Sequence, residues 1–212
     1  MIGLTAGVSP NVDFLKNTDL AIERGIVVNE FLETNMPEVY SLGDCAQFSD
    51  PVIGRRAIEQ VWYTGKIMGK ALAQTICGNP TKYNPGQWFN SAKFLDIEYQ
   101  TYGWVFARLR EGERDFYWEH PDGKKCMHFV FNEKNNMFLG VNTFGIRLRH
   151  ELFDRWLNEE RTIDYVLEHL KDANFDPEFY SQYEEQILGN FNRENDNDLV
   201  SKKKSWKRIF SR

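Results

Sequence analysis

Cysteine and histidine are scarce in this sequence, and their spacing excludes several kinds of site. The 212 residues include only three cysteines, Cys45, Cys77 and Cys126, and no CxxC or CxxxxC pair. An odd number of widely separated cysteines excludes the disulfide framework of a small secreted protein. The four histidines do not fall at metal-ligand spacing with a cysteine or with each other. We therefore expect neither a disulfide nor a metal site.

Long apolar runs are also missing. No segment approaches the 18 or more apolar residues of a membrane span, and the first residues lack the basic start and apolar stretch of a signal peptide. We therefore expect a cytoplasmic chain with no transmembrane segment. With 42% hydrophobic and 15% aromatic residues, the chain can bury one large core or two small ones.

The charge is unevenly distributed along the chain. The net charge is −5, but Ser201 to Arg212 carries six basic residues and no acid. Without those six, 20 of the 26 basic residues face 31 acidic ones. A body this acidic excludes a nucleic-acid-binding surface.

The first part of the chain has the pattern of short strands followed by a helix. Three short apolar runs, each closed by turn residues, predict strands at Ile2 to Val8, Gly25 to Val28 and Glu38 to Leu42. From Arg56 to Cys77, apolar residues recur at three- and four-residue steps until Gly78 and Pro80, which predicts a helix.

The second part predicts an antiparallel sheet followed by helices, an α+β arrangement. Five strands are predicted, at Phe94 to Gln100, Tyr102 to Arg110, Arg114 to His120, Cys126 to Phe131 and Met137 to Asn142. Pro121-Asp122-Gly123 and Asn132 to Asn136 supply hairpin turns. Three helices are predicted, at Ile146 to Asn158, at Ile163 to Lys171 with Thr162 as cap, and at Pro177 to Asn190 after Asp176.

One segment carries a pattern with chemical meaning. Between Thr34 and Ala46 a turn leads into an apolar strand that is expected to end at Gly43-Asp44. A carboxylate at the end of a parallel strand faces the crevice that open α/β sheets use for nucleotide ligands, where it can accept a hydrogen bond from a ribityl or ribose hydroxyl. Gly43 would let the backbone approach such a ligand closely, because it has no Cβ atom.

This pattern resembles the second FAD fingerprint of the FAD-dependent pyridine nucleotide-disulphide oxidoreductases. The neighbouring segments match as well: Gly7 to Asn11 resembles the family's G-x-x-P-N segment, and Gly25 to Asn29 its G-I-x-V-D strand. The resemblance covers residues 3 to 69. It implies that Asp44 holds the ribityl chain of FAD and that Gly43 makes room for it.

The resemblance also implies a role for the predicted helix. In the family, the first turn of the helix after the fingerprint points backbone N–H groups at the pyrimidine edge of the flavin, and here that place is taken by Ile58 to Lys66. Gln60, Val61 and Trp62 are therefore expected to contact FAD, and a helix amino terminus stabilises negative charge on it. For Trp62 and Tyr63 the alternative is core or interface packing.

Several family features are absent. The chain has no G-x-G-x-x-G motif for FAD or for NAD(P)H, and no redox cysteine pair. His120-Pro121 invites comparison with an acid/base motif of the family, but the following residues fit a hairpin turn and lack the partner glutamate. We expect His120 to be structural, and we assign no catalytic residue.

The expected organisation has three parts. Residues 1–78 form the carboxy-terminal part of an FAD-binding doubly wound domain, and residues 79–191 an α+β interface or dimerisation domain. Residues 192–212 form a flexible basic tail, with a polar tether at Asn192 to Asp198. The tail fits either an amphipathic helix for an anionic membrane surface or acidic partner, or an unstructured end.

Two functions follow from the resemblance. The first is a fragment of a flavoprotein oxidoreductase that moves electrons from NAD(P)H through FAD to an acceptor, with the fragment inactive alone. The second is a non-catalytic module for homodimerisation or for docking a redox-partner protein. A membrane-associated accessory protein acting through the basic tail is a third.

Overall fold

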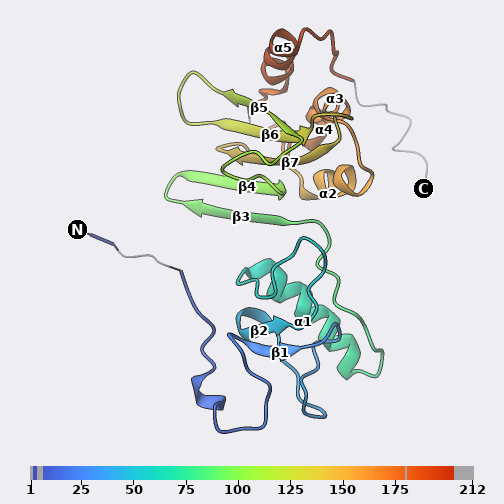
Figure 1. The fold of residues 1–212 in the computed structure, drawn as a ribbon. Coiled ribbons are helices and arrows are strands. Elements are labelled where there is room, and N and C mark those ends of the chain that lie inside the picture. The colour runs from blue at the N-terminus through green and yellow to red at the C-terminus, as the bar shows by residue number, and fades with distance from the viewer. Residues whose placement is uncertain (1, 4–6, 180, 203–212) are drawn as a thin grey trace. The chain divides into compact units, whose positions relative to one another are not determined.

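The computed structural model describes residues 2–3, 7–179 and 181–202. The chain folds into two compact units, Met1–Gly86 and Gln87–Arg212, each with its own hydrophobic core. Figure 1 shows the elements of both units along the chain. The predicted tail residues 203–212 lie outside the described residues.

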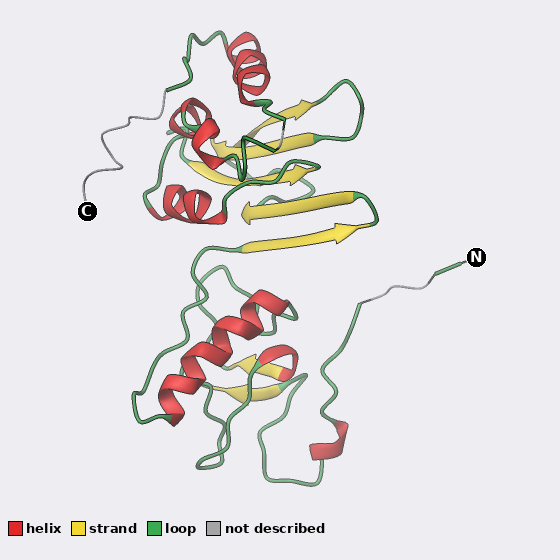
Figure 2. Ribbon diagram, turned by 180° about the vertical axis from the view of Figure 1, so that it is seen from behind, coloured by secondary structure: helices red, strands yellow, loops and turns green. Residues whose placement is uncertain are grey.

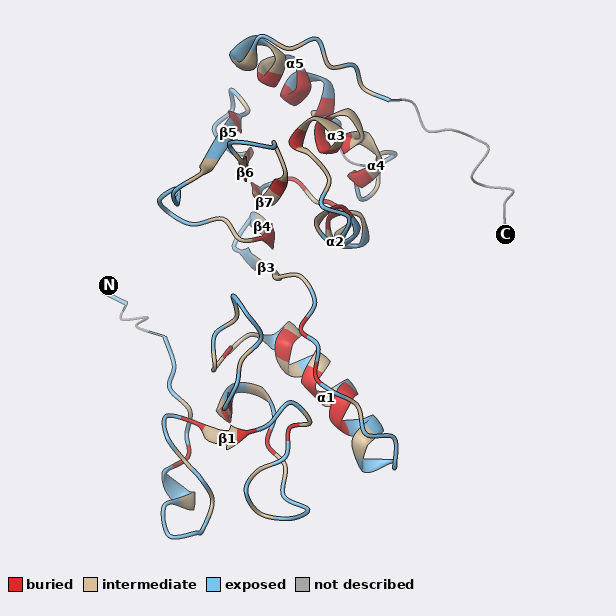
Figure 3. Cartoon of the chain, turned by 45° about the vertical axis from the view of Figure 1, so that its right-hand side comes forward, coloured by how far each residue is buried: buried red, intermediate tan, exposed pale blue. Residues whose placement is uncertain are grey.

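The first unit is built on a parallel strand pair and one helix. β1 (Ile26–Val28) pairs with β2 (Ala46–Phe48) in parallel, which confirms the strand predicted at Gly25 to Val28. α1 (Trp62–Ile76) contributes Met68 and Leu72 to the core, and its last residues are exposed (Figure 3). The other buried members of this core are Val28, Leu32, Ala46, Phe48 and Tyr83.

The strand predicted at Glu38 to Leu42 is wrong. Glu38 adopts a left-handed conformation with φ of 62° inside a turn, and Tyr40 forms only an isolated bridge with Glu33. The parallel partner of β1 is β2 instead, which begins after the short 3-10 helix η2 (Gly43–Cys45). The Gly43-Asp44 turn therefore precedes a strand rather than ending one.

The strand predicted at Ile2 to Val8 is wrong for the described residues. Residues 2–3 and 7–8 form no strand, and the side chains of Ile2 and Val8 are 93% and 71% exposed. An apolar run becomes a buried strand only where a neighbouring strand satisfies its backbone groups. The short 3-10 helix η1 (Asp13–Leu15) follows.

The helix predicted from Arg56 begins later, at Trp62. Arg55 and Glu59 form a side-chain ion pair, and the Val61 amide donates to the Glu59 carbonyl oxygen at 3.0 Å. These contacts hold residues 55–61 in an irregular segment, although their apolar spacing continues that of the helix.

The second unit is a five-stranded antiparallel sheet with helices on one side (Figure 2). The strand order is β3-β4-β7-β6-β5. The strands are β3 (Phe89–Phe94), β4 (Ile97–Gly103), β5 (Glu113–Glu119), β6 (Cys126–Asn132) and β7 (Phe138–Phe144). The last three agree with the predicted strands to within two residues at each end. With the parallel pair of the first unit, this sheet confirms the expected fold class.

The helices pack against the sheet through a large aromatic and aliphatic core. They are α2 (His150–Asn158), α3 (Ile163–Glu168), α4 (Leu170–Ala173) and α5 (Glu184–Asn195). Thr162 caps α3 as predicted, because its side-chain oxygen accepts a hydrogen bond from the Tyr165 amide at 3.3 Å. The central residues of this core include Phe116, Phe129, Phe138, Phe153, Trp156 and Phe191.

The first two predicted strands of the sheet are misplaced. The predicted strand Phe94 to Gln100 runs across the tight turn between β3 and β4, where Phe94 pairs with Ile97 and Leu95 has φ of 52°. The strand predicted to begin at Tyr102 overlaps β4 only at its last two residues, Tyr102 and Gly103. The turn was missed because Leu95-Asp96 contains neither glycine nor proline.

The last helix and the residues after it also differ from expectation. α5 begins at Glu184 rather than Pro177 and runs to Asn195, into the predicted tether. Beyond it, the Asn192 side chain bonds to both the amide and the carbonyl of Leu199, and Leu199 packs on the core. Lys202 forms an ion pair with Glu168 at 2.6 Å. Side-chain contacts therefore hold residues 192–202 against the second unit.

Candidate functional site

Gly43 opens the predicted site in a conformation suited to glycine. Its φ is +75°, a left-handed value that side chains disfavour, and no atom lies within 4 Å of the position a Cβ atom would take. Its amide N–H points to the Met68 sulfur of α1, at 3.2 Å. The outer side of Gly43 is therefore open to a ligand, and its inner side is fixed to the helix.

Asp44 and Gln60 lie next to each other at this turn. Asp44 is exposed, and its backbone carbonyl oxygen lies 3.5 Å from the Gln60 side-chain nitrogen, at the limit for a hydrogen bond. This contact fixes the segment before α1 to the turn. Asp44 is an exposed residue, so its carboxylate is accessible to a ligand. A free carboxylate beside an open glycine is a suitable acceptor for a ligand hydroxyl.

The start of α1 lies beside the same turn. The Cβ atom that Gly65 lacks would be 3.6 Å from the Gly43 Cα atom, and that of Gly69 would be 3.9 Å from Leu42. Val61 precedes the helix in an extended conformation, and an aliphatic side chain cannot cap the first amide groups. Small residues on this face of α1 thus allow its positive end to approach Gly43 and Asp44.

Trp62 is an exposed member of the five predicted site residues. Trp62 is 68% exposed. Its ring meets the Tyr63 ring edge to face at 5.1 Å, and the Lys66 ammonium lies 4.9 Å from the centre of the Trp62 ring. Core packing, the alternative considered for Trp62, does not describe it within the first unit. The structure therefore gathers Gly43, Asp44, Gln60, Val61 and Trp62 around one turn and one helix end.

Sequence reasoning missed a buried ionic cluster close to this site. The Arg55 guanidinium donates to both carboxylate oxygens of Glu59, at 2.8 and 2.6 Å, with the two side chains only 7% and 6% exposed. The Tyr83 ring stacks on Phe48 at 4.9 Å beside this pair. Opposite charges four residues apart were a signal, but such spacing is more often found on exposed helix surfaces.

The surroundings of Tyr83 raise the pKa of its hydroxyl. Burial, with a smaller contribution from the negative charge of Glu59, raises the pKa of Tyr83 to about 12, although the Arg55 charge acts in the opposite direction. The hydroxyl therefore stays protonated at neutral pH and does not serve as a base.

His120 lies at the hairpin between β5 and β6, where it makes local hydrogen bonds. Its ring nitrogen Nδ1 accepts a hydrogen bond from the Asp122 amide at 3.3 Å, and its backbone N–H and carbonyl close the hairpin with Lys125 and Gly123.

Within residues 2–3, 7–179 and 181–202, no three His, Cys, Asp or Glu side chains form a group that would hold a metal ion. None of the helices in the described part of the chain is both long and apolar enough to cross a bilayer.

Comparison with known proteins identifies the first unit. Residues 1–68 match the family model described as pyridine nucleotide-disulphide oxidoreductase. Over these residues, about a third of the chain, the first unit is similar to this family.

Two similar proteins show how far the similarity extends along the chain. The chain is 34% identical over 167 residues to the assimilatory nitrate reductase electron transfer subunit of Bacillus subtilis, covering 75% of this chain and 20% of that protein. It is 50% identical over 80 residues to the NADH-rubredoxin oxidoreductase of Clostridium acetobutylicum, covering 37% of this chain and 19% of that protein. The chain thus spans about a fifth of the length of these relatives.

Solved structures share the fold across both units. A NAD-dependent persulfide reductase from A. fulgidus matches with a TM-score of 0.63 and 16% identity, over 90% of this chain and 38% of that one. An FAD-dependent pyridine nucleotide-disulphide oxidoreductase from Desulfovibrio vulgaris matches with a TM-score of 0.59 and 18% identity, over 89% of this chain and 48% of that one. The second unit, which the family model does not reach, therefore also has a counterpart of known fold.

Proposed function

We propose that this chain is the carboxy-terminal portion of a flavoprotein oxidoreductase that passes electrons from NAD(P)H through FAD to an acceptor. The observation that carries the proposal is the open, left-handed Gly43 packed against the amino-terminal half of α1, with the Asp44 carboxylate beside it. Similarity to relatives named as NADH-dependent oxidoreductases supports the same reaction class. Segments outside this chain would supply the G-x-G-x-x-G motifs.

The residues present fit one wall of an FAD site. Asp44 would accept a hydrogen bond from a ribityl hydroxyl, and Gly43 would leave room for the chain of that ligand. The first amide groups of α1, which begin after Val61, would lie at the edge of the flavin where negative charge accumulates. Gln60 would keep the turn and the helix end together, and Trp62 would cover the site from solvent. FAD, when bound, supplies the hydride and electron chemistry.

The proposed acceptor is a small electron-transfer protein. Relatives named for rubredoxin come from Clostridium acetobutylicum and Acinetobacter baylyi, which supports an acceptor of that kind. We place the reaction in the cytoplasm, because the three cysteines are free thiols. The second unit is proposed to mediate homodimerisation, as its class and position along the chain suggest.

The test is flavin retention by the complete gene product, including any residues that precede Met1. We expect purified protein mixed with FAD and desalted to absorb near about 450 nm, a property of oxidised flavin. Asp44→Ala should weaken FAD binding by about ten- to a hundredfold, because a hydrogen bond to a charged group contributes about 1.5–3 kcal/mol. Asp19→Ala, an exposed aspartate of the same unit, is the matched control.

Each outcome decides between the two functions. Bound flavin that is reduced by NADH supports the oxidoreductase, and equal FAD content in Asp44→Ala and wild type would remove the role assigned to Asp44. A complete gene product that retains no flavin would favour the non-catalytic dimerisation or docking module.

A further inference from the structure

The face of the second unit's sheet that is turned away from the helices carries a pocket of its own. It is an open hollow of about 560 Å³, within the range of about 300–1,000 Å³ found for small-molecule sites. Its lining comes from the ends of β3 to β7 and from the turn between β5 and β6. All of its lining residues belong to the second unit, and none of them belongs to the candidate flavin site.

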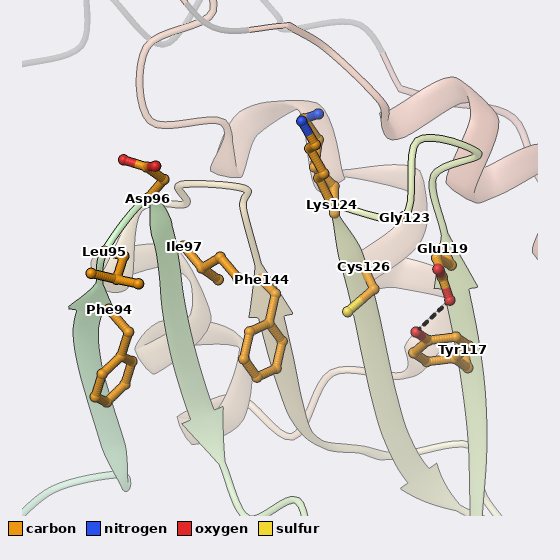
Figure 4. A pocket seen from close by; sticks show the side chains of 11 residues that line it. Phe94, Leu95, Asp96, Ile97, Tyr117, Glu119, Gly123, Lys124, Cys126 and Phe144 are labelled. Atoms are coloured by element: carbon orange, nitrogen blue, oxygen red, sulfur yellow. Dashed lines mark hydrogen bonds between the residues drawn. The ribbon is translucent and has the colours of Figure 1, made fainter. Parts of the chain in front are cut away.

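The centre of this pocket is a slot between two aromatic rings. Cys126 on β6 lies directly opposite Phe144 on β7 in the strand register, and β5 on the other side contributes Tyr117. Figure 4 shows the rings of Phe144 and Tyr117 on either side of the Cys126 thiol. The small side chain of Cys126 leaves the space between the rings open.

The spacing of the strands sets the distance between the backbones that carry the two rings. β5 and β7 are both neighbours of β6, so their backbones are two strand spacings apart, roughly 10 Å. A planar ring in contact on both faces needs roughly 7–8 Å between its neighbours, because carbon atoms pack best at about 3.5–4.0 Å. The backbones that carry the two rings therefore leave space for one ring system above Cys126, although the rings are offset along the strands, because Glu119 pairs with Cys126 and Tyr117 with His128.

Both walls are held in place by neighbouring side chains. The Tyr117 hydroxyl donates to the Glu119 carboxylate at 2.9 Å, and its hydrogen bonds to the Cys126 thiol and to Glu119 raise the pKa of Tyr117. Phe144 stacks on Tyr99 at 5.8 Å, and Tyr99 stacks on Phe94 at 6.1 Å. The walls are thus positioned before any ligand arrives.

The charges around the pocket favour an anionic group near its mouth. Four charged residues line it, namely Asp96, Glu119, Lys124 and Lys125. Lys125 is paired with Asp122 at 2.6 Å, and Glu119 is engaged by Tyr117. Among the described residues no carboxylate pairs with the Lys124 ammonium. Figure 4 places Lys124 above the slot, whereas Asp96 lies above Leu95 at the turn between β3 and β4.

We propose that this slot binds a planar aromatic carboxylate, with its ring between Phe144 and Tyr117 over Cys126 and its carboxylate paired with Lys124. The proposal does not depend on flavin binding, because every residue involved belongs to the second unit. A second copy of the chain laid on the same sheet face is the competing occupant, and the test separates the two.

The test uses the whole chain and 2-naphthoate as the probe, followed by ligand-observed NMR. We expect saturable binding that Cys126→Met, which fills the slot, weakens at least tenfold. Cys126→Ser, which keeps the slot open and keeps a hydrogen-bonding partner for Tyr117, should bind as wild type does. Lys124→Gln should weaken naphthoate severalfold without affecting the neutral analogue 2-naphthalenemethanol. Lys134→Gln, in the turn between β6 and β7, is the charge control.

Thiol protection gives an independent readout. We expect 2-naphthoate to slow the alkylation of Cys126 by iodoacetamide, read by peptide mass mapping, and to leave the exposed Cys77 unaffected. Equal binding by Cys126→Met and wild type, or no saturable binding, would overturn the proposal. So would protection of Cys126 that rises with protein concentration in the absence of naphthoate, because that result assigns the face to a second copy.

Discussion

Gly65 on α1 lies directly against Gly43, so that a Cβ atom added at Gly65 would be 3.6 Å from the Gly43 Cα atom. That distance is ordinary van der Waals contact, so one methyl group fits and a larger side chain does not. The relationship joins the helix to the turn that carries Asp44, and it makes the two positions testable together.

Gly65→Ala should stabilise the chain, and Gly65→Leu should disturb the site. Alanine adds about 0.5–1 kcal/mol of helix stability without a clash, which a denaturant titration would detect. Leucine would push α1 away from Gly43 and lower FAD retention by the complete gene product. Gly189→Leu is the matched control, since Gly189 lies in α5 with no atom within 4 Å of its missing Cβ. Full FAD retention by Gly65→Leu would show that the close approach is not needed.

Glu59→Ala should be among the most damaging substitutions in the first unit. It removes the carboxylate from a guanidinium that is 7% exposed, and breaking a buried pair in this way costs about 3–5 kcal/mol in free energy of unfolding. Asp13→Ala breaks the exposed pair with Lys16, whose side chains are 79% and 66% exposed, and should cost less than about 1 kcal/mol. Similar losses in the two variants, measured by urea unfolding, would contradict the buried pair.

The raised pKa of Tyr83 predicts that the folded chain loses stability at high pH. Its pKa is raised to about 12 in the folded chain, whereas an unfolded tyrosine titrates near 10. Above pH of about 10 the unfolded chain releases this proton while the folded chain keeps it, so stability falls between about 10 and 12. Tyr83→Phe retains the ring that stacks on Phe48 and should show a smaller fall over that interval. An identical pH dependence of unfolding would rule out Tyr83 as its source.

The parts of the fold that were predicted correctly have local signals. The hairpin between β5 and β6 turns at Pro121-Asp122-Gly123, and α3 begins after a threonine cap. The parts that were missed depend on contacts distant from the pattern. The turn at Leu95-Asp96 has neither glycine nor proline, and the start of α1 is delayed by the ion pair between Arg55 and Glu59.

The candidate site was predictable only as a fingerprint. Gly43 and Asp44 were found from the order of residues around them, but the sequence alone does not reveal that Gly65 and Met68 face that turn. The buried cluster of Arg55, Glu59 and Tyr83 was not found, because charged residues in a sequence are usually exposed. Arg55 and Glu59 lie beside the stacked rings of Phe48 and Tyr83, two residues that are 35 positions apart in the chain.

Gly103 and its partner Gly140 leave no room for a Cβ atom where β4 meets β7. The two glycines pair across β4 and β7, and Gly103 has φ of +68°. A Cβ atom at Gly103 would lie 2.2 Å from the Leu139 carbonyl oxygen, and one at Gly140 would lie 2.8 Å from that of Tyr102. These neighbours are backbone atoms inside a sheet, so they cannot move aside without disturbing the strands.

Gly103→Ala should therefore cost more than its left-handed conformation alone. Gly123 is the matched control, because its φ of +66° is nearly the same but its nearest neighbour is the Glu119 side chain at 3.8 Å. Gly123→Ala should lose about 1–2 kcal/mol, the usual cost of a left-handed conformation. Gly103→Ala adds the clash to that cost, so the difference between the two free energies of unfolding measures the close approach of β4 and β7. Equal losses would mean that moving β4 and β7 apart costs no measurable free energy of unfolding. The packing of Tyr102 on the helices would then hold β4 in place.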